Sequence, residues 1–500
     1  MKKIIYISAL LISTVFTSCE DFLSVESPDQ LTSDSFWRNE TDAQAGISAV
    51  YSQLENSLDT WEFAEIKWPV EAYREDIIEL GKDAMNYPNW VELAKYTYTN
   101  GNSQITSYWK NNYRGISFAN QVIEKVPQIP AGEIDENIRT QIINEAYFLR
   151  AYYHLKLLLN WEKIIIQDSY IDNEEELDKD VSERDKAWEF IIGDFTKATA
   201  LPESYSSENI GRATKGAAYA YLGFSEMTRA YENSMNREGF EAALKALENV
   251  KGYSLEDNFV SMFNGTNKNC SESIFELQFS LSTANGANYS TQMHRWIGCN
   301  ELMGWDEIRP SEILVNEFKK EGTTSFDGLY DQRYYETLFT KCEYFNDNTG
   351  KVYGKNYDDW FTTDFNAFRK FMPADIEGLE NSRCAINIPL MRYSNVLLMK
   401  AEILNQLDRG QEGLIFINEV REKHGKMPAV NLTKKEDIQS QIEHERILEF
   451  VLENWRWYDL RRWGKLSSAI EKTGRDNFDE KKHSFYPIPL TEINSNNKLQ

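Results

Sequence analysis

Two segments of the sequence combine flat aromatic rings with hydrogen-bonding side chains, a combination that suits the binding of sugars. Sugar rings present C–H faces that stack on aromatic rings, and their hydroxyl groups pair with amide, carboxylate or guanidinium groups. The candidate ligand contacts are Tyr87, Asn89, Trp90, Arg295, Trp296 and Trp305. Residues 357–360 (YDDW) form a third candidate segment. For each single ring, core packing is an equally good explanation, because burying it contributes roughly 2–3 kcal/mol.

The sequence carries no signature of an enzyme or of a bound cofactor. It has no GxSxG motif, P-loop or dinucleotide-binding glycine pattern, and its 5 histidines show no HExxH spacing. A glycoside hydrolase needs two carboxylates about 5–10 Å apart. Nothing in the sequence singles out such a pair among the 79 acidic residues. We therefore expect a binding protein that is not an enzyme and that uses no cofactor or metal.

Length and charge limit the classes of partner. The 500 residues exceed the usual size of one domain, so we expect one enlarged domain or two to three domains. The 54 basic and 79 acidic residues give a net charge of -25, which repels the phosphates of nucleic acids. We therefore expect no nucleic-acid partner, and a neutral or basic ligand rather than a polyanion.

The N-terminus is typical of a secreted, lipid-anchored protein. Lys2 and Lys3 precede an apolar stretch, residues 4–15, that is too short to span a bilayer. Residues 16–19 (FTSC) then resemble the cleavage site of a bacterial lipoprotein signal. The resemblance implies that residues 1–18 are a signal peptide and that Cys19 carries the lipid anchor. The other cysteines are Cys270, Cys299, Cys342 and Cys384, and their spacing leaves all three possible disulfide pairings open.

Hydrophobic periodicity predicts helices at both ends of the chain and an irregular middle. The predicted helices cover residues 41–58, 107–126, 142–161, 186–200, 212–231, 240–250, 390–407, 412–424 and 435–462. Residues 81–102 are expected to form an aromatic loop, and residues 273–279 alternate like a strand. Gly216, Ala217, Ala220 and Gly223 form a stripe of small residues that lets a neighbouring helix approach closely. Glu145 and Arg150 are expected to pair with other helices.

Several stretches of the sequence match, in order, the motifs of one known family. They are residues 144–151 (NEAYFLRA), 211–218 (GRATKGAA), 272–278 (ESIFELQ), 389–402 (PLMRYSNVLLMKAE), 417–421 (INEVR), 447–464 (ILEFVLENWRWYDLRRWG) and 486–489 (YPIP). Together they resemble the SusD/RagB family of outer-membrane lipoproteins from residue 19 to the C-terminus. Within the 447–464 motif and just before it, alternating charges at helical spacing predict a structural stripe of ion pairs: Arg446, Glu449, Glu453 and Arg456.

The resemblance implies a mainly α, SusD-like domain over residues 19–500, with four tetratricopeptide-like helical hairpins and a loop-rich, partly β insert. Helical parts are expected at residues 19–60, 103–251 and 388–465, a variable binding insert at about 252–387, and an extended tail at 466–500. The resemblance also implies capture of an oligosaccharide at the cell surface, and its delivery to a TonB-dependent SusC-like transporter. A peptide-binding lipoprotein of the RagB type is the alternative, and a glycoside hydrolase is less favoured.

Overall fold

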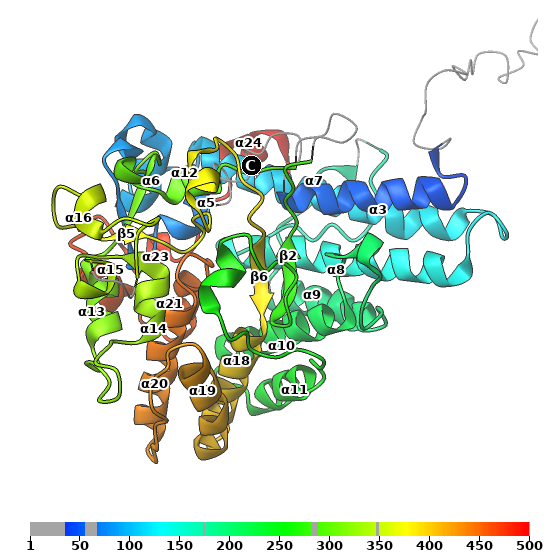
Figure 1. The fold of residues 1–500 in the computed structure, drawn as a ribbon. Coiled ribbons are helices and arrows are strands. Elements are labelled where there is room, and N and C mark those ends of the chain that lie inside the picture. Colours follow the sequence, from blue (N-terminus) through cyan, green and yellow to red (C-terminus); the bar gives the residue numbers. More distant parts are fainter. Residues whose placement is uncertain (1–35, 56–67, 174–175, 283–288, 347–349, 500) are drawn as a thin grey trace, which may run out of the picture.

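The computed structural model describes residues 36–55, 68–173, 176–282, 289–346 and 350–499. The chain is mainly helical with a few short strands, which confirms the predicted fold class (Figure 1). In Figure 1 the long helices of the N-terminal half lie on one side and the short elements of the middle of the chain on the other, with β2 and β6 between them. The tetratricopeptide-like geometry of the helix pairs stays a prediction.

Six long helices form the N-terminal frame, and consecutive ones pack against each other. They are α3 (Glu40–Glu55), α7 (Ser103–Lys125), α8 (Glu136–Asn160), α9 (Arg184–Ala198), α10 (Lys215–Glu232) and α11 (Arg237–Leu247). The side chains of Asn102 and Asp135 cap α7 and α8 by accepting hydrogen bonds from the first free backbone N–H groups. The predicted helices of this region are thus present with shifted ends, and residues 56–58 of the first predicted helix lie outside the described residues.

The predicted stripe of small residues lies where α10 meets its neighbours. A Cβ atom on Gly223 would lie 2.5 Å from the side chain of Leu247 on α11, and one on Gly216 would lie 2.5 Å from the ring of Tyr253. Both distances are far below van der Waals contact, so these positions accept only glycine without rearrangement. The expected close approach of a neighbouring helix is confirmed.

Buried ion pairs connect α8 to its neighbours, as predicted for Glu145 and Arg150. Arg150 binds Asp194 of α9, with Nε 2.6 Å from Oδ2. Glu145 lies 3.2 Å from the guanidinium of Arg212 and accepts a 2.7 Å hydrogen bond from the hydroxyl of Tyr51 on α3. Each carboxylate is therefore compensated inside the protein rather than presented to a ligand.

The C-terminal helices are α18 (Tyr393–Gln406), α19 (Gly410–Lys423), α20 (Lys435–Glu449) and α21 (Arg456–Arg462). The prediction of one helix over residues 435–462 is wrong: the chain turns after Glu449, and Leu452 and Asn454 adopt left-handed backbone angles with φ of 63°. The prediction that the four charged residues form a stripe on one face of one helix is therefore wrong. These residues do form structural ion pairs, but with partners elsewhere, such as Asp459 for Arg446 at 2.7 Å and Asp76 for Arg456 at 2.8 Å.

Among the described residues, the middle of the chain forms short helices and takes part in three antiparallel strand pairs. The helices are α12 (Met293–Ile297), α13 (Glu312–Lys319), α14 (Gln332–Thr337), α15 (Glu343–Asn346), α16 (Tyr357–Trp360) and α17 (Ile376–Glu380). The pairs are β1 (Ile78–Leu80) with β3 (Ile308–Pro310), β2 (Ser273–Leu277) with β6 (Ile388–Arg392), and β4 (Leu338–Phe339) with β5 (Ala367–Phe368). The predicted strand is present as β2, whereas β6 takes the first three residues predicted for the helix at 390–407.

Two segments expected to be irregular contain helices. Residues 81–102 include a 3-10 helix, η3 (Asp83–Asn86), and α6 (Pro88–Lys95), preceded by α5 (Trp68–Ala72). Pro88 starts α6 because a first helical residue needs no backbone N–H partner. The tail contains α22 (Leu466–Glu471), α23 (Glu480–His483) and α24 (Leu490–Ser495), so the prediction that it is extended throughout is wrong. Residues 485–489 are not helical, as predicted.

The predicted signal peptide and Cys19 lie outside the described residues. Within the part of the chain that the structure describes, no helix is long and apolar enough to cross a membrane. The four remaining cysteines are free thiols. Burial raises the pKa of Cys299 to about 12 and that of Cys384 to about 11, so both stay protonated and unreactive at neutral pH.

Candidate functional site

The two candidate binding segments lie side by side although they are far apart in the sequence. Strands β1 and β3 pair with Leu80 opposite Ile308. Beyond this pair, the backbone N–H of Gly81 donates to the carbonyl of Glu307 at 2.9 Å. The two backbones approach so closely that a Cβ atom on Gly81 would lie 1.8 Å from the carbonyl oxygen of Asp306. This ladder places η3 and α6 against α12 and the turn that follows it, in the same part of Figure 1.

The contact brings together the four predicted aromatic residues Tyr87, Trp90, Trp296 and Trp305, which we call the aromatic cluster. Tyr87 stacks on Trp90 with ring centroids 3.9 Å apart, and Trp90 meets Trp296 edge to face at 4.3 Å. Trp305 contacts Trp296 at 6.0 Å. Stacked and edge-to-face arrangements are those of favourable aromatic pairs, so the rings hold one another in fixed orientations.

Only part of the aromatic cluster reaches the surface. Trp90 and Trp296 are 2% and 1% exposed, and their rings therefore support the cluster from below. Tyr87 is 37% exposed and Trp305 is half-buried. Two exposed methionines that sequence reasoning missed, Met85 in η3 and Met303 just before Trp305, lie on the adjoining turns. Their only sequence signal is their proximity to the predicted rings. A ligand would therefore meet Tyr87 and Trp305 first.

The two predicted polar contacts are already hydrogen-bonded within the protein. Arg295 donates to the backbone carbonyls of Met303, Glu380 and Asn381, the last two at 2.8 Å. It therefore fixes the turn that carries Trp305. Asn89 is exposed and its amide donates to Ser103 Oγ at 2.7 Å. Whether any of the six predicted residues touches a ligand stays a prediction.

Carboxyl groups that sequence reasoning did not single out lie beside the aromatic cluster. Burial raises the pKa of Glu307 to about 8, and the charges of Asp83 and Asp306 act in the same direction. The Glu307 side chain is therefore largely protonated at neutral pH, and its Oε2 atom has no hydrogen-bond partner among the described residues. Asp306 is paired with Arg309 at 2.7 Å. Asp306 and Glu307 are 0% and 1% exposed and lie beneath the surface, whereas the half-buried Asp83 can meet hydroxyl groups on a ligand.

The third candidate segment forms a separate contact. Tyr357 is fully buried and its hydroxyl donates to the backbone carbonyl of Phe365. Trp360 is half-buried, packs 6.4 Å from Tyr353, and donates from Nε1 to the carbonyl of Val352 at 2.7 Å. These contacts hold the turn around α16, and they identify the segment as part of the packing of the middle region.

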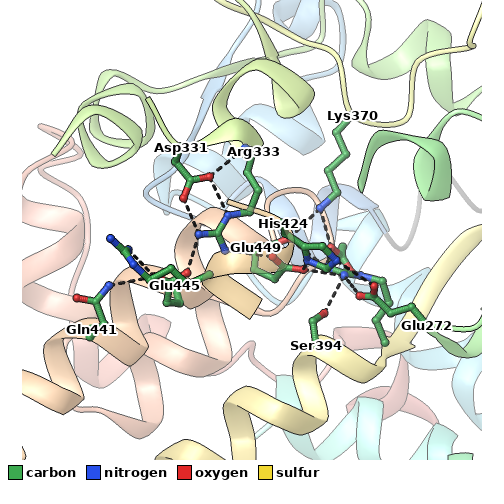
Figure 2. A network of polar contacts seen from close by, with 12 residues as sticks. Glu272, Asp331, Arg333, Lys370, Ser394, His424, Gln441, Glu445 and Glu449 are labelled. Carbon is green, nitrogen blue, oxygen red and sulfur yellow. Dashed lines mark hydrogen bonds and ion pairs between the residues drawn. The ribbon is translucent and has the colours of Figure 1, made fainter. Parts of the chain in front are cut away.

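Apart from the aromatic cluster, an assembly of charged side chains lies inside the protein, where the middle of the chain packs on the C-terminal helices (Figure 2). Arg333 contacts Asp331, Glu445 and Glu449, with N–O distances of 2.7, 2.6 and 3.1 Å. Arg392 binds Glu449 at 2.8 Å and also Glu272. These side chains are at most 3% exposed. We call the whole assembly the buried ion network; its further members are Lys370, Ser394, Arg421, His424, Gln441 and Glu453.

Glu272, His424 and Glu449 in the buried ion network have the residue types of a metal site, with possible ligand atoms within 4.8 Å of one another. The contacts favour a protonated histidine instead. His424 lies 2.9 Å from Glu449 and 3.1 Å from Glu272, one nitrogen to each carboxylate. Burial lowers the pKa of His424, but the two carboxylates outweigh it and raise the pKa to about 9. Arg392 also binds both carboxylates. Their negative charge is therefore already compensated without a metal ion.

Two family models match separate parts of the chain. Residues 271–500 match the model described as "SusD family". Residues 21–224 match the model described as "Starch-binding associating with outer membrane".

Full-length relatives and solved structures agree with these matches. SusD-like protein P38 of Formosa agariphila is 24% identical over 537 residues, which cover 100% of this chain and 99% of that protein. A SusD superfamily protein from Bacteroides vulgatus superposes with a TM-score of 0.79 at 23% identity, covering 92% of this chain and 98% of the other. A laminarin-binding SusD-like protein gives a TM-score of 0.73 at 22% identity, with the same coverage.

Proposed function

The chain belongs to the SusD/RagB family, and from this premise we propose that it is a glycan-binding lipoprotein of the outer membrane. The observation that carries the proposal is the aromatic cluster, in which two distant segments of the chain join their rings next to carboxyl groups. The descriptions of similar proteins as starch-binding and laminarin-binding support the same class of ligand. We expect no catalysis, because the role is capture of an oligosaccharide.

Binding in this proposal uses a shallow surface rather than a deep pocket. Tyr87 and Trp305 offer apolar area to the C–H face of a sugar ring. Trp90 and Trp296 fix these outer rings, and the half-buried Asp83 is placed to pair with hydroxyl groups. Because the outer rings are already held in place, little side-chain entropy is lost on binding.

The proposed anchor and partner follow from the family. Lipid chains on Cys19 would hold the protein on the outer membrane, since each buried CH₂ contributes about 0.8 kcal/mol. From there, the bound oligosaccharide would pass to a SusC-like, TonB-dependent transporter. Labelling with a radioactive fatty acid tests the anchor: a Cys19→Ala variant should lose the label and leave the membrane fraction.

Affinity electrophoresis of the purified protein tests the ligand class. Gels containing starch, laminarin or other polysaccharides should retard the protein, whereas a peptide mixture added to a plain gel should not change its mobility. Incubation with a polysaccharide that retards it should release no new reducing ends. Peptide binding without glycan binding would overturn the proposal in favour of the RagB-type alternative, and released reducing ends would show a hydrolase.

A further inference from the structure

A cavity of about 340 Å³ lies between α10 and α21, and none of the residues that line it belongs to the aromatic cluster. Its walls include four rings, those of Phe224, Tyr231, Tyr458 and Phe485. Arg184, Arg461 and Arg462 also line it. A concave site with apolar rings and a few polar groups has the general form of a small-molecule site, so the charge state of the three arginines decides what it could hold.

Two of the three arginines are compensated by carboxylates. Arg184 binds Glu232 at 2.6 Å, and Arg462 binds Glu402 at 2.7 Å and also Asp459. Glu232 accepts a further hydrogen bond from Trp188, and these contacts lower its pKa in spite of burial, so it stays ionised. These pairs leave no charge to attract a ligand.

Arg461 differs from its neighbours because no carboxylate of the described residues pairs with it. Its Nη1 atom donates to the backbone carbonyls of Leu159 at 2.6 Å and Ser484 at 3.3 Å. Its Nε and Nη2 atoms have no hydrogen-bond partner within the described ranges of the chain. Burial, and next the charge of Arg184, lower the pKa of Arg461, and the charge of Glu232 acts in the opposite direction without forming an ion pair with it. The half-buried guanidinium of Arg461 therefore has no carboxylate on its Nε–Nη2 edge, which is the edge that can bind two oxygens at once.

Aromatic rings lie near the guanidinium group of Arg461. The ring of Phe485 lies 4.3 Å from the guanidinium carbon of Arg461 and 4.8 Å from that of Arg184. Phe224 and Tyr458 are 1% and 4% exposed and form the inner wall. A ligand with an anionic group and a flat or ring-shaped body would match both features.

We infer that this cavity binds a small monoanionic carboxylate, with its two oxygens on the Nε–Nη2 edge of Arg461 and its ring against Phe224 and Tyr458. Carboxylate and guanidinium are both planar and form two parallel hydrogen bonds. A doubly charged phosphate fits less well, because the ionised Glu232 and the exposed Glu162 also line the cavity. The site does not depend on glycan binding at the aromatic cluster.

Isothermal titration calorimetry with four probes tests this site. D-Glucuronate and benzoate carry the carboxylate on a sugar ring and on an aromatic ring, and D-glucose and benzyl alcohol are their uncharged counterparts. We expect saturable binding of at least one acid and none of the uncharged compounds. Tighter binding of glucuronate would identify the ligand as an acidic sugar, and tighter binding of benzoate would identify it as an aromatic acid.

Two variants assign the binding to the cavity. Arg461→Lys keeps the charge but loses the two-pronged edge, and should weaken binding by at least about tenfold. Thr228→Leu leaves Arg461 in place and fills part of the cavity, since Thr228 lines it and is 5% exposed. It should also weaken binding, whereas the surface control Arg409→Lys should not.

Circular dichroism checks that each variant is folded. The inference is overturned if neither acid binds, if the uncharged compounds bind equally well, or if a folded Arg461→Lys variant binds with unchanged affinity.

Discussion

At the scale of single residues, the buried ion network determines how the middle of the chain is held. The middle of the chain contributes Asp331, Arg333 and Lys370. Strand β6 contributes Arg392, and helix α20 contributes Glu445 and Glu449. Ionised groups inside a protein are costly unless each is paired and hydrogen-bonded. The pairing is thus a condition for docking the two regions, and single substitutions should have large effects.

Removing Arg392 should strongly destabilise the protein. Arg392→Leu would leave Glu272, Glu449 and Glu453 with less compensating charge in the interior, at a cost of about 3–5 kcal/mol. Urea unfolding followed by circular dichroism measures the loss. Arg409→Leu is the matched control, because its partner Glu412 and Arg409 itself are largely solvent-exposed and the stability should not change measurably. Equal effects of the two substitutions would contradict this role.

His424 should make stability depend on pH in a defined direction. Its folded pKa of about 9 lies above the ordinary value of 6.5. The stabilisation is therefore complete below pH 6.5 and is lost as the pH rises through 9, on the order of 3 kcal/mol in total. The measurement is the difference in unfolding free energy between the wild type and a His424→Gln variant from pH 6 to pH 10. Taking this difference removes the opposing effect of Lys370, whose pKa burial lowers to about 8. A pH-independent difference would contradict a buried, protonated His424.

At the scale of elements, the sequence predicts what depends on local pattern and misses what depends on backbone turns. The long helices follow from apolar spacing, and β2 follows from the strand-like pattern of residues 273–279. The break after Glu449 is not visible, because Leu452 is an unusual residue for a left-handed conformation and the apolar pattern continues past it. Conversely, α6 was missed because its eight residues are too few to show a period, and Pro88 indicated a loop.

Two helix glycines should respond in opposite ways to alanine. Gly223→Ala places a Cβ atom 2.5 Å from Leu247 and should destabilise the protein by about 1–3 kcal/mol through overpacking. At Gly193 in α9, no side chain of the described residues lies within 4 Å of the position that a Cβ atom would take. Gly193→Ala should therefore stabilise the protein by up to about 1 kcal/mol through helix propensity. Thermal unfolding of both variants checks the signs. Stabilisation by both substitutions would show that α10 and α11 are not in close contact.

At the scale of the whole molecule, the candidate binding site exists only because distant segments meet. Sequence reasoning identified the rings by type, and residue type does not reveal which of them are buried. The pairing of β1 with β3 and the contact of Gly81 with Asp306 decide that Trp90 and Trp296 lie below Tyr87 and Trp305. The role of Glu307 is likewise not visible in the sequence, where it is one of many acidic residues. Only the fold shows that it is buried beside the rings.

Calorimetric titration of outer-ring variants tests the central claim, with a glycan that retards the wild type on gels. Tyr87→Ala and Trp305→Ala should each weaken binding by about five- to tenfold, and the double variant more, since each ring contributes stacking energy of about 1 kcal/mol or more. Phe326→Ala is the control, because Phe326 is a 68% exposed ring outside the aromatic cluster. Folded outer-ring variants that bind as tightly as the wild type and the control would contradict the claim that the aromatic cluster is the glycan site.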